Sequence, residues 1–272
     1  MSGAEMEYPY SSEDAPLVRV GKVPFTVSNL DDATKSVISF ATNRVGIPIR
    51  LANAYCVALA VDDSSYCSIF QGVGITYPDG APVSWFMRRR NTLARTVRGP
   101  DLFCSVLDAG QALNIRHFFY GTTEKTLCAL RDVVADKYPG AIWSGMFAPP
   151  FGAVTEALID EAEERINRAN PDIVWVALGT PKQDQIAALL AHRIDIPCIG
   201  VGAAFDFLAG TVKQAPGWIR GTGFEWVYRL AREPKRLWRR YLIGNPKFLY
   251  SAVFQSKTIP DSLDRAKGKI WE

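Results

Sequence analysis

One aspartate in a glycine-flanked turn is the side chain best placed to do chemistry. Asp79 lies in the stretch Gly-Val-Gly-Ile-Thr-Tyr-Pro-Asp-Gly, residues 72–80, directly before a predicted helix. Pro-Asp-Gly is also a common turn, in which the aspartate only closes the turn or caps the helix. At the end of a strand in an open α/β sheet, the same carboxylate can accept a proton from a bound hydroxyl group. Asp79 is therefore a candidate general base, of the kind that an inverting sugar transfer requires.

A second loop has the features of an anion-binding turn. The stretch 178–184 reads Leu-Gly-Thr-Pro-Lys-Gln-Asp and follows an apolar run. Thr180 predicts an N-cap and Pro181 the first helical position, and a helix start at a strand end offers free N–H groups to an anion. Gly179 lets the backbone approach a ligand, and Lys182 and Gln183 can add charge and hydrogen bonds. A capped turn without a ligand is the alternative.

Two further strand ends are weaker candidates. Asn53 stands where a strand passes into a helix, so it predicts either a helix cap or a ligand contact. The stretch 200–210 begins Gly-Val-Gly but lacks the GxGxxG spacing, which argues against NAD binding. There is no P-loop motif, and Asp62-Asp63 is not a DxD motif and is expected to be solvated within a helix.

Cysteine and histidine usage excludes other classes of site. Five widely spaced cysteines form no CxxC pair, which argues against a disulfide framework and a zinc site and predicts buried, reduced thiols. Only His117 and His192 could supply a histidine-based metal site or triad. The net charge of +3 does not suggest a polyanion-binding protein.

These loops must be held in place by strands and helices, which the sequence indicates through short apolar runs that alternate with amphipathic segments. The runs predict strands, and the segments between them predict helices, so the pattern predicts a Rossmann-like α/β fold with a mostly parallel sheet covered by helices on both faces. Predicted strands are 47–51, 68–71, 115–120, 141–143, 173–178 and 196–201; predicted helices are 54–62, 83–89, 101–114, 124–137, 154–170 and 182–193.

The C-terminal part differs in composition. Residues 218–250 hold eight Lys or Arg against two Glu, together with eight aromatic residues. We predict a flexible leader over 1–20, an α/β catalytic domain over 21–212, a helical basic and aromatic appendage over 213–256, and a tail over 257–272.

The N-terminus does not resemble a signal peptide, and no apolar run approaches the roughly 18 residues of a spanning helix. The appendage suits an anionic membrane surface; a solvated basic helix is the alternative, and no nucleic-acid-binding module is recognisable.

In combination these segments resemble the WecG/TagA/CpsF family, glycosyltransferase family 26. The matching pieces occur in order between about residues 25 and 250. They are Ala52-Asn53, Pro78 to Trp85, Arg98 to Phe103, Ala177 to Asp184, Gly200 to Gly210, Ala215-Pro216, Phe224 to Leu230 and Glu233 to Tyr241.

The resemblance implies roles for individual residues. Asp79 matches the proposed general base, Asn53 a residue near the donor sugar, and Gln183 a residue of the active-site loop. Three arginines of the appendage match residues thought to reach a diphosphate: Arg229, Arg236 and Arg239. Other substrate contacts are expected at Gly80, Arg98, Asp101, Gly179, Thr180, Lys182, Gly202, Phe205 and Asp206. Leu51 departs from relatives that carry Thr there, which leaves a hydroxyl contribution at this position in doubt.

The resulting hypothesis is a metal-independent, inverting transferase without a cofactor. It would move a hexose or N-acetylhexosamine from a UDP-sugar to a polyprenyl-diphosphate-linked acceptor for a surface polysaccharide. The expected location is the cytoplasmic face of the cell membrane, with a possible homo-oligomer and no nucleic-acid partner. The alternative is a non-catalytic nucleotide-sugar-binding or scaffold protein of a polysaccharide assembly complex.

Overall fold

The structure is a computed structural model that describes residues 15–219 and 221–256, except for the side chain of Arg236. The predicted tail over 257–272 and the first fourteen residues of the predicted leader lie outside the described residues. Residues 17–20 of the predicted leader are a strand, so that part of the prediction is wrong.

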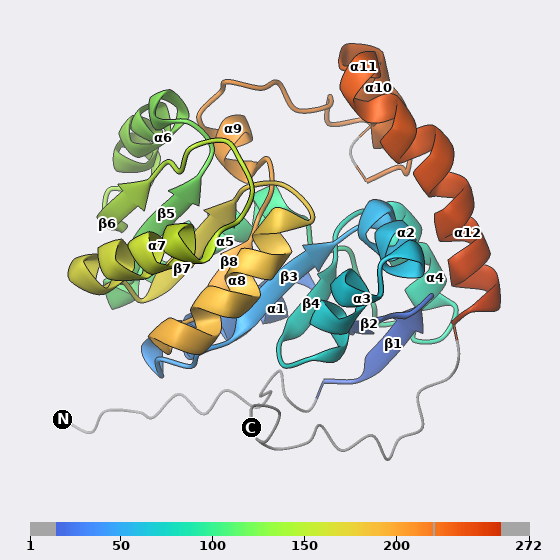
Figure 1. Ribbon diagram of the computed structural model, residues 1–272, viewed down its shortest axis with the longest axis horizontal. Coiled ribbons are helices and arrows are strands. Elements are labelled where there is room, and N and C mark those ends of the chain that lie inside the picture. Colours follow the sequence, from blue (N-terminus) through green and yellow to red (C-terminus); the bar gives the residue numbers. More distant parts are fainter. Residues whose placement is uncertain (1–14, 220, 257–272) are drawn as a thin grey trace.

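A six-stranded parallel sheet forms the centre of the molecule (Figure 1), which confirms the predicted fold class. Its strand order is β4-β3-β8-β7-β5-β6. The strands are β3 (Pro48–Ala52), β4 (Ile75–Pro78), β5 (Arg116–Gly121), β6 (Ile142–Phe147), β7 (Ile173–Ala177) and β8 (Cys198–Gly200). Central strands are buried on both faces, and alternate residues of β7 enter different cores: Trp175 enters one cluster, and Val174 and Val176 enter another.

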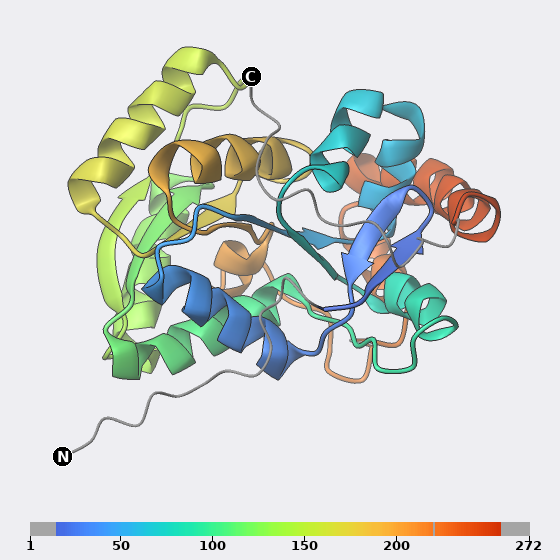
Figure 2. The same cartoon turned by 90° about the horizontal axis from the view of Figure 1, so that it is seen from below.

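Helices cover both faces of the sheet (Figure 2). On one face, α1 (Leu30–Thr42), α5 (Gly99–Gly110) and α6 (Glu124–Lys137) share a core cluster with the sheet. A short 3₁₀ turn, η1 (Gln111–Leu113), follows α5. On the other face lie α7 (Glu156–Ala169) and α8 (Lys182–Ile194). Each helix brings one apolar side to the sheet, as the amphipathic segments predicted.

A third core cluster lies beyond β4. It joins the antiparallel hairpin of β1 (Leu17–Val20) and β2 (Val23–Thr26) to α2 (Ala54–Asp62), α3 (Ser64–Gln71), α4 (Ala81–Arg88) and the C-terminal helix α12 (Gly244–Phe254). The hairpin turns at Gly21, whose φ of 63° favours glycine.

The predicted strand over 68–71 is wrong, because these residues are the last turn of α3. Asp63 begins this helix, since its carboxylate accepts the backbone N–H of Tyr66. Asp62 and Asp63 are exposed as expected, but they lie at the junction of two helices rather than in the middle of one: Asp62 is the last residue of α2, and Asp63 is the N-cap of α3. The strand of this unit is β4, a few residues later, and it ends directly before Asp79.

The C-terminal segment contains several helices. They are α9 (Ala204–Leu208), α10 (Glu225–Arg232), α11 (Pro234–Trp238), the π-helical η2 (Arg239–Ile243) and α12. Pro234 opens a new helix, α11, because proline suits the first turn of a helix and cannot continue the preceding one. No helix among the described residues is long and apolar enough to cross a membrane.

The last helix is part of the core. It packs along α2 (Figure 1), and Phe248 and Ala252 are buried in the cluster that also holds the hairpin. Removing everything after residue 210 would therefore uncover α2, so point variants are better probes of this segment than truncation. The proposed boundary at 212/213 stays a prediction.

Candidate active site

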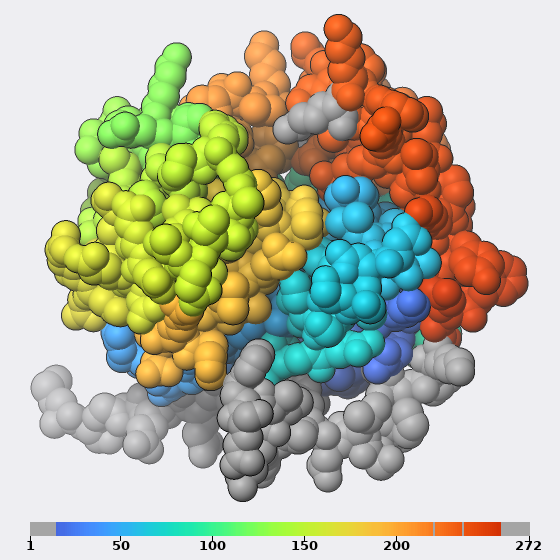
Figure 3. Space-filling model, in the orientation of Figure 1, coloured from blue at the N-terminus to red at the C-terminus, as the bar shows by residue number. Residues whose placement is uncertain are grey.

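The four loops singled out from the sequence lie at one edge of the sheet. Asn53 follows β3, Asp79 follows β4, Gly179 is in the loop after β7, and Gly202 is in the loop after β8. These four strands are consecutive neighbours in the order β4-β3-β8-β7. The carboxyl ends of parallel strands meet at the same edge, and open α/β sheets bind ligands there. Figure 3 shows the surface hollowed between the start of α8 (gold), α2 (blue) and the C-terminal helices (red).

Asp79 is fixed by the backbone on both sides. Its N–H donates to the carbonyl of Ala52 at 2.9 Å, which continues the β3–β4 pairing by one residue. Gly80 then adopts a φ of 107° as the N-cap of α4, a conformation that favours glycine. The Oδ1 atom of Asp79 accepts the N–H of Gly99 at 3.4 Å, at the start of α5. The side chain is therefore held at the sheet edge.

Three charged residues face this aspartate, Arg98, Arg229 and Glu225, and a fourth, Asp101, pairs with Arg98; we call the five together the Asp79 cluster. Arg98 lies 3.3 Å from Asp101 and 3.4 Å from Glu225. Arg229, from α10, lies 3.2 Å from Glu225. Glu225 thus joins the C-terminal helix α10 to the start of α5, and the cluster holds three carboxylates and two guanidinium groups.

Burial raises the pKa of Asp79 above the ordinary value of 3.8, while the nearby charges of Arg229 and Arg98 oppose the rise. Glu225 raises the pKa further, and the N–H of Gly99 lowers it. A base with a raised pKa is a better proton acceptor, provided that it stays ionised at the working pH.

The pH–rate profile should report this shift. Because only ionised Asp79 accepts a proton, we expect kcat/KM to fall as the pH drops through the raised pKa of this group. The acid limb should therefore lie above the usual aspartate range of about 3.9. A profile of kcat/KM against pH checks it, and a flat profile down to about pH 4 would contradict it.

The loop after β7 meets the start of α2, which follows the loop after β3. Asn53 caps α2 by accepting the N–H of Tyr55 at 3.0 Å, so the capping interpretation is confirmed. The Sγ atom of Cys56 lies 3.9 Å from Oγ1 of Thr180, which brings the two loops together. Gln183 is buried, and its Oε1 accepts the N–H of Gly179 at 3.1 Å. Gly179 has a φ of 75°, and no atom lies within 4 Å of the place where a Cβ would stand, so this backbone borders open space.

Several sequence predictions for these loops are wrong. Thr180 is not the N-cap of α8, which begins at Lys182 after Pro181 without a side-chain cap. The ammonium group of Lys182 donates to the carbonyl of Gly152 and so is directed to the β6–α7 loop. Phe205 packs fully buried against Phe103, so its side chain is part of the core and is not available to a substrate.

Two other positions have structural partners. The carboxylate of Asp206 accepts the hydroxyl of Thr211 at 3.1 Å. Leu51 is buried in the core, and a Cβ on Gly99 would lie 3.4 Å from it. The side chain of Leu51 thus packs against the start of α5.

The C-terminal arginines do not all reach the site. Arg229 belongs to the Asp79 cluster and lies over the ring of Phe207 at 5.2 Å. Arg239 is exposed and lies over the ring of its neighbour Trp238, so the structure does not place it in the cluster. Arg236 is in α11, but its side chain lies outside what the structure describes.

Sequence reasoning missed Arg240, which faces the protein. Its guanidinium lies 4.6 Å from the ring centre of Tyr55 in the first turn of α2. Its Nε atom is buried and has no hydrogen-bond partner among the residues that the structure describes. The spacing of eleven residues from Arg229 is close to three helical turns and was a usable signal, although Pro234 and the π-helical turn intervene.

A buried polar network supports the start of α8. Tyr66 donates its hydroxyl to Asp184 at 2.7 Å, and the fully buried Arg50 donates to the carbonyl of Val73 at 2.7 Å. Burial raises the pKa of Asp184 to about 6, against the lowering effects of Tyr66 and Arg50. Burial also lowers the pKa of Arg50 to about 10.

This shift predicts a pH-dependent stability. The folded-state pKa of Asp184 exceeds that of an unfolded chain, so ionised Asp184 lowers the free energy of unfolding at neutral pH. This cost decreases as the pH falls below about 6, because the folded protein then binds the proton first. The unfolding free energy of the wild type, relative to Asp184→Asn, should rise by on the order of 1 kcal/mol from about pH 7.5 to about pH 5. Urea denaturation measures it; a constant or falling difference would contradict the shift.

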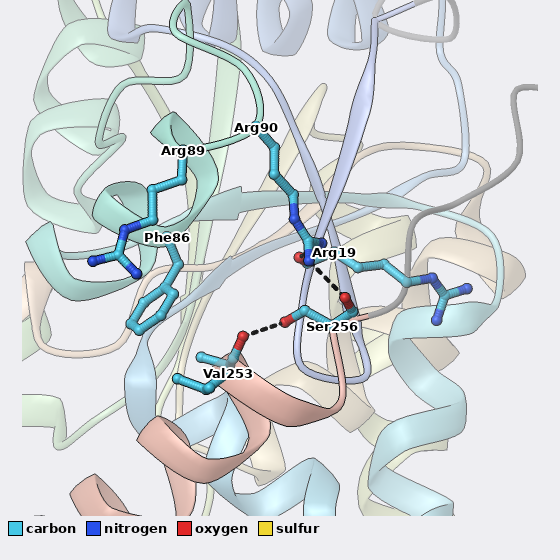
Figure 4. A pocket seen from close by; sticks show the side chains of 7 residues that line it. Arg19, Phe86, Arg89, Arg90, Val253 and Ser256 are labelled. Atoms are coloured by element: carbon cyan, nitrogen blue, oxygen red, sulfur yellow. Dashed lines mark hydrogen bonds between the residues drawn. The ribbon is translucent and has the colours of Figure 1, made fainter.

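A surface pocket between α4 and α12 lies away from these loops (Figure 4). It is lined by Arg19, Phe86, Arg89, Arg90, Ala252, Val253 and Ser256. The guanidinium of Arg90 donates to the carbonyls of Arg19 at 3.0 Å and Ser256 at 2.6 Å. Arg90 therefore ties the first strand to the end of α12, which is a structural role.

Fold and site together define an α/β enzyme of group transfer, with a carboxylate held among arginines at a strand end. Comparison with known proteins makes this specific. A family model described as "Glycosyl transferase WecG/TagA/CpsF family" matches residues 18–261. The chain therefore belongs to the WecG/TagA/CpsF family and is a glycosyltransferase.

Three of the similar curated proteins share one name. The chain is 28% identical to the N-acetylglucosaminyldiphosphoundecaprenol N-acetyl-beta-D-mannosaminyltransferase of Bacillus subtilis (strain 168), over 88% of this chain and 91% of that protein. It is 30% identical to the protein of that name from Bacillus spizizenii, over 84% and 90%. The protein of that name from Staphylococcus aureus (strain MW2) is 27% identical, over 78% and 81%.

Proposed function

We propose that this glycosyltransferase moves an N-acetylhexosamine from a UDP-sugar to a polyprenyl-diphosphate-linked sugar, with inversion at the transferred carbon and without a metal ion. The observation that carries the proposal is the Asp79 cluster, in which a half-buried carboxylate is bracketed by Arg98 and Arg229. The names of the similar proteins support both the N-acetylhexosamine and the lipid diphosphate.

The charges of the site fit a diphosphate. Guanidinium groups bind phosphate oxygens through paired hydrogen bonds, and they stabilise the charge that develops on a leaving diphosphate. Arg229 is half-buried beside Asp79, and Arg240 faces the start of α2 with an unpartnered Nε. The start of α8 lies near the same edge, but the N–H groups of Gln183 and Asp184 already donate to backbone carbonyls, so the proposed anion contacts are the arginines.

The proposed reaction is a single displacement. Asp79 takes the proton from the acceptor hydroxyl as its oxygen forms a bond to the anomeric carbon. The bond from that carbon to the diphosphate oxygen breaks, and UDP leaves from the opposite face with the electron pair. Arg229 stabilises the charge on the departing diphosphate, and the proton remains on Asp79 until solvent removes it.

Membrane contact through the C-terminal helices belongs to the same proposal, because a polyprenyl acceptor is membrane-bound. Exposed apolar side chains lie on α11, η2 and α12, and basic residues lie among them. The exposed apolar residues are Trp238, Leu242, Ile243, Leu249, Tyr250, Val253 and Phe254. Aromatic and basic side chains together suit an anionic lipid surface. Binding to vesicles with and without anionic lipid tests this contact.

A transfer assay with defined substrates tests the reaction. The protein is incubated with UDP-N-acetylmannosamine, then with a panel of other UDP-sugars, and a short-chain polyprenyl-diphospho-N-acetylglucosamine. UDP release and the glycolipid product are measured with and without EDTA, and NMR of the product gives the anomeric configuration. Nucleotide binding without UDP release across the panel would favour a non-catalytic sensor or scaffold, and loss of activity in EDTA would contradict metal independence.

A further inference from the structure

Glu225 links helix α10 to the surroundings of Asp79, the proposed general base. It stands at the first position of α10, and its carboxylate lies 3.4 Å from Arg98 and 3.2 Å from Arg229. Arg98 belongs to the start of α5, 127 residues away along the chain. One carboxylate thus contacts two arginines from two separate elements.

An acidic residue in the first turn of a helix is favourable by itself, because it lies near the positive end of the helix dipole. That effect needs no partner, yet here the carboxylate is directed to both guanidinium groups and is largely covered, with 22% of its side chain exposed. Arg98 is more covered still, at 13%. A pair in this environment is screened less by water than a surface pair.

We propose that Glu225 is a positioning residue of the proposed transfer reaction, which docks α10 against Arg98 and thereby holds Arg229 beside Asp79. Glu225 does not touch the reacting atoms. This proposal rests on the function proposed above for the same site, and it explains how a helix remote in sequence supplies a cation to the strand-end aspartate.

The charges around Asp79 give one readout, which tests whether Glu225 faces this residue; the docking contact gives a second. The groups that face it are Arg98 and the N–H of Gly99 from α5, and Glu225 and Arg229 from α10. Replacing Glu225 by Gln removes the one carboxylate of this set that raises the pKa of Asp79, while the amide oxygen can still accept from both arginines. The pKa of Asp79 should then fall. Replacing Glu225 by Ala also removes the docking contact.

The experiment uses the full chain without substrate. Carboxyl carbons of aspartate are labelled, Asp79 is assigned through the Asp79→Asn spectrum, and its titration is followed by NMR in wild type, Glu225→Gln and Glu225→Ala. Amide hydrogen exchange of residues 226–232 is measured on the same proteins. We expect a lower pKa of Asp79 in Glu225→Gln, and exchange of α10 about tenfold faster in Glu225→Ala than in wild type, the equivalent of losing one charge-assisted contact.

Glu164→Gln is the matched control, since it removes one exposed carboxylate of α7 that pairs with Arg168. It should change neither readout. An unchanged Asp79 titration in Glu225→Gln, or unchanged exchange of α10 in Glu225→Ala, would overturn the proposal. Neither measurement depends on turnover, so a failed transfer assay would leave this result standing and would count against the proposed function alone.

Discussion

Asp79→Asn should reduce kcat of the transfer reaction by about 10³-fold or more while leaving the fold intact. General-base catalysis contributes about 10² to 10⁴-fold in enzymes, and an amide cannot accept the hydroxyl proton. Asparagine matches aspartate in shape, and its amide oxygen can still accept the N–H of Gly99. The change therefore removes the base and keeps the turn. Turnover of UDP-sugar with the polyprenyl acceptor is the measurement.

Binding and stability separate a catalytic from a structural effect in this variant. Affinity for the UDP-sugar should stay within a few-fold of wild type, and the thermal midpoint should not fall, because a half-buried carboxylate with a raised pKa is replaced by a neutral group. Asp132→Asn, in the exposed part of α6, is the matched control and should turn over normally. Near-normal turnover by Asp79→Asn would exclude this residue as the base.

Arg229→Gln should lower kcat/KM by about 10² to 10³-fold, the range seen when one preorganised donor to a developing anion is removed. The guanidinium is held by Glu225 and by the ring of Phe207, so it is already ordered where a diphosphate would leave. Its loss also removes a positive charge that lowers the pKa of Asp79, so the acid limb of the pH–rate profile should move to higher pH. Steady-state kinetics over a pH series measure both effects.

Arg232→Gln is a close control, one turn further along α10. Arg232 is exposed and lies over the ring of Tyr228, so its removal alters the same helix and the same net charge without touching the Asp79 cluster. Arg229→Lys should recover part of the activity, because it keeps the charge and loses the planar fork. Equal losses in Arg229→Gln and Arg232→Gln would indicate a general effect of basic charge, such as weaker membrane contact.

Much of the site was visible in the sequence because its signals are local. A strand end, a turn and a helix start lie within a few residues of Asp79, of Asn53 and of Gln183, so each loop could be identified by itself. Their meeting at one edge followed from the parallel sheet, which the alternating pattern predicted. Arg98 and Arg229 were also singled out, through the resemblance to the family.

The sequence predictions that were wrong depend on contacts between residues distant in sequence. The apolar run 68–71 reads equally as a buried strand or the buried side of a short helix, and only packing against the hairpin and α8 decides for α3. The partner of Arg98 in α10 could not be inferred from either segment alone. Phe205 in α9 and Lys182 at the start of α8 directly follow loops that were identified correctly, but the direction of their side chains is set by neighbours such as Phe103 and Gly152.

The two ends of the described chain meet. The N–H of Gly21 donates to the hydroxyl of Ser256 at 2.6 Å, across 235 residues of sequence, and α12 closes over the core that the first hairpin begins. During synthesis the hairpin leaves the ribosome long before its partner exists, since chains grow at roughly 5–20 residues per second. The nascent protein therefore carries an uncovered apolar surface until α12 has been synthesised. A prematurely terminated chain would expose this surface permanently and become a target for chaperones and proteases.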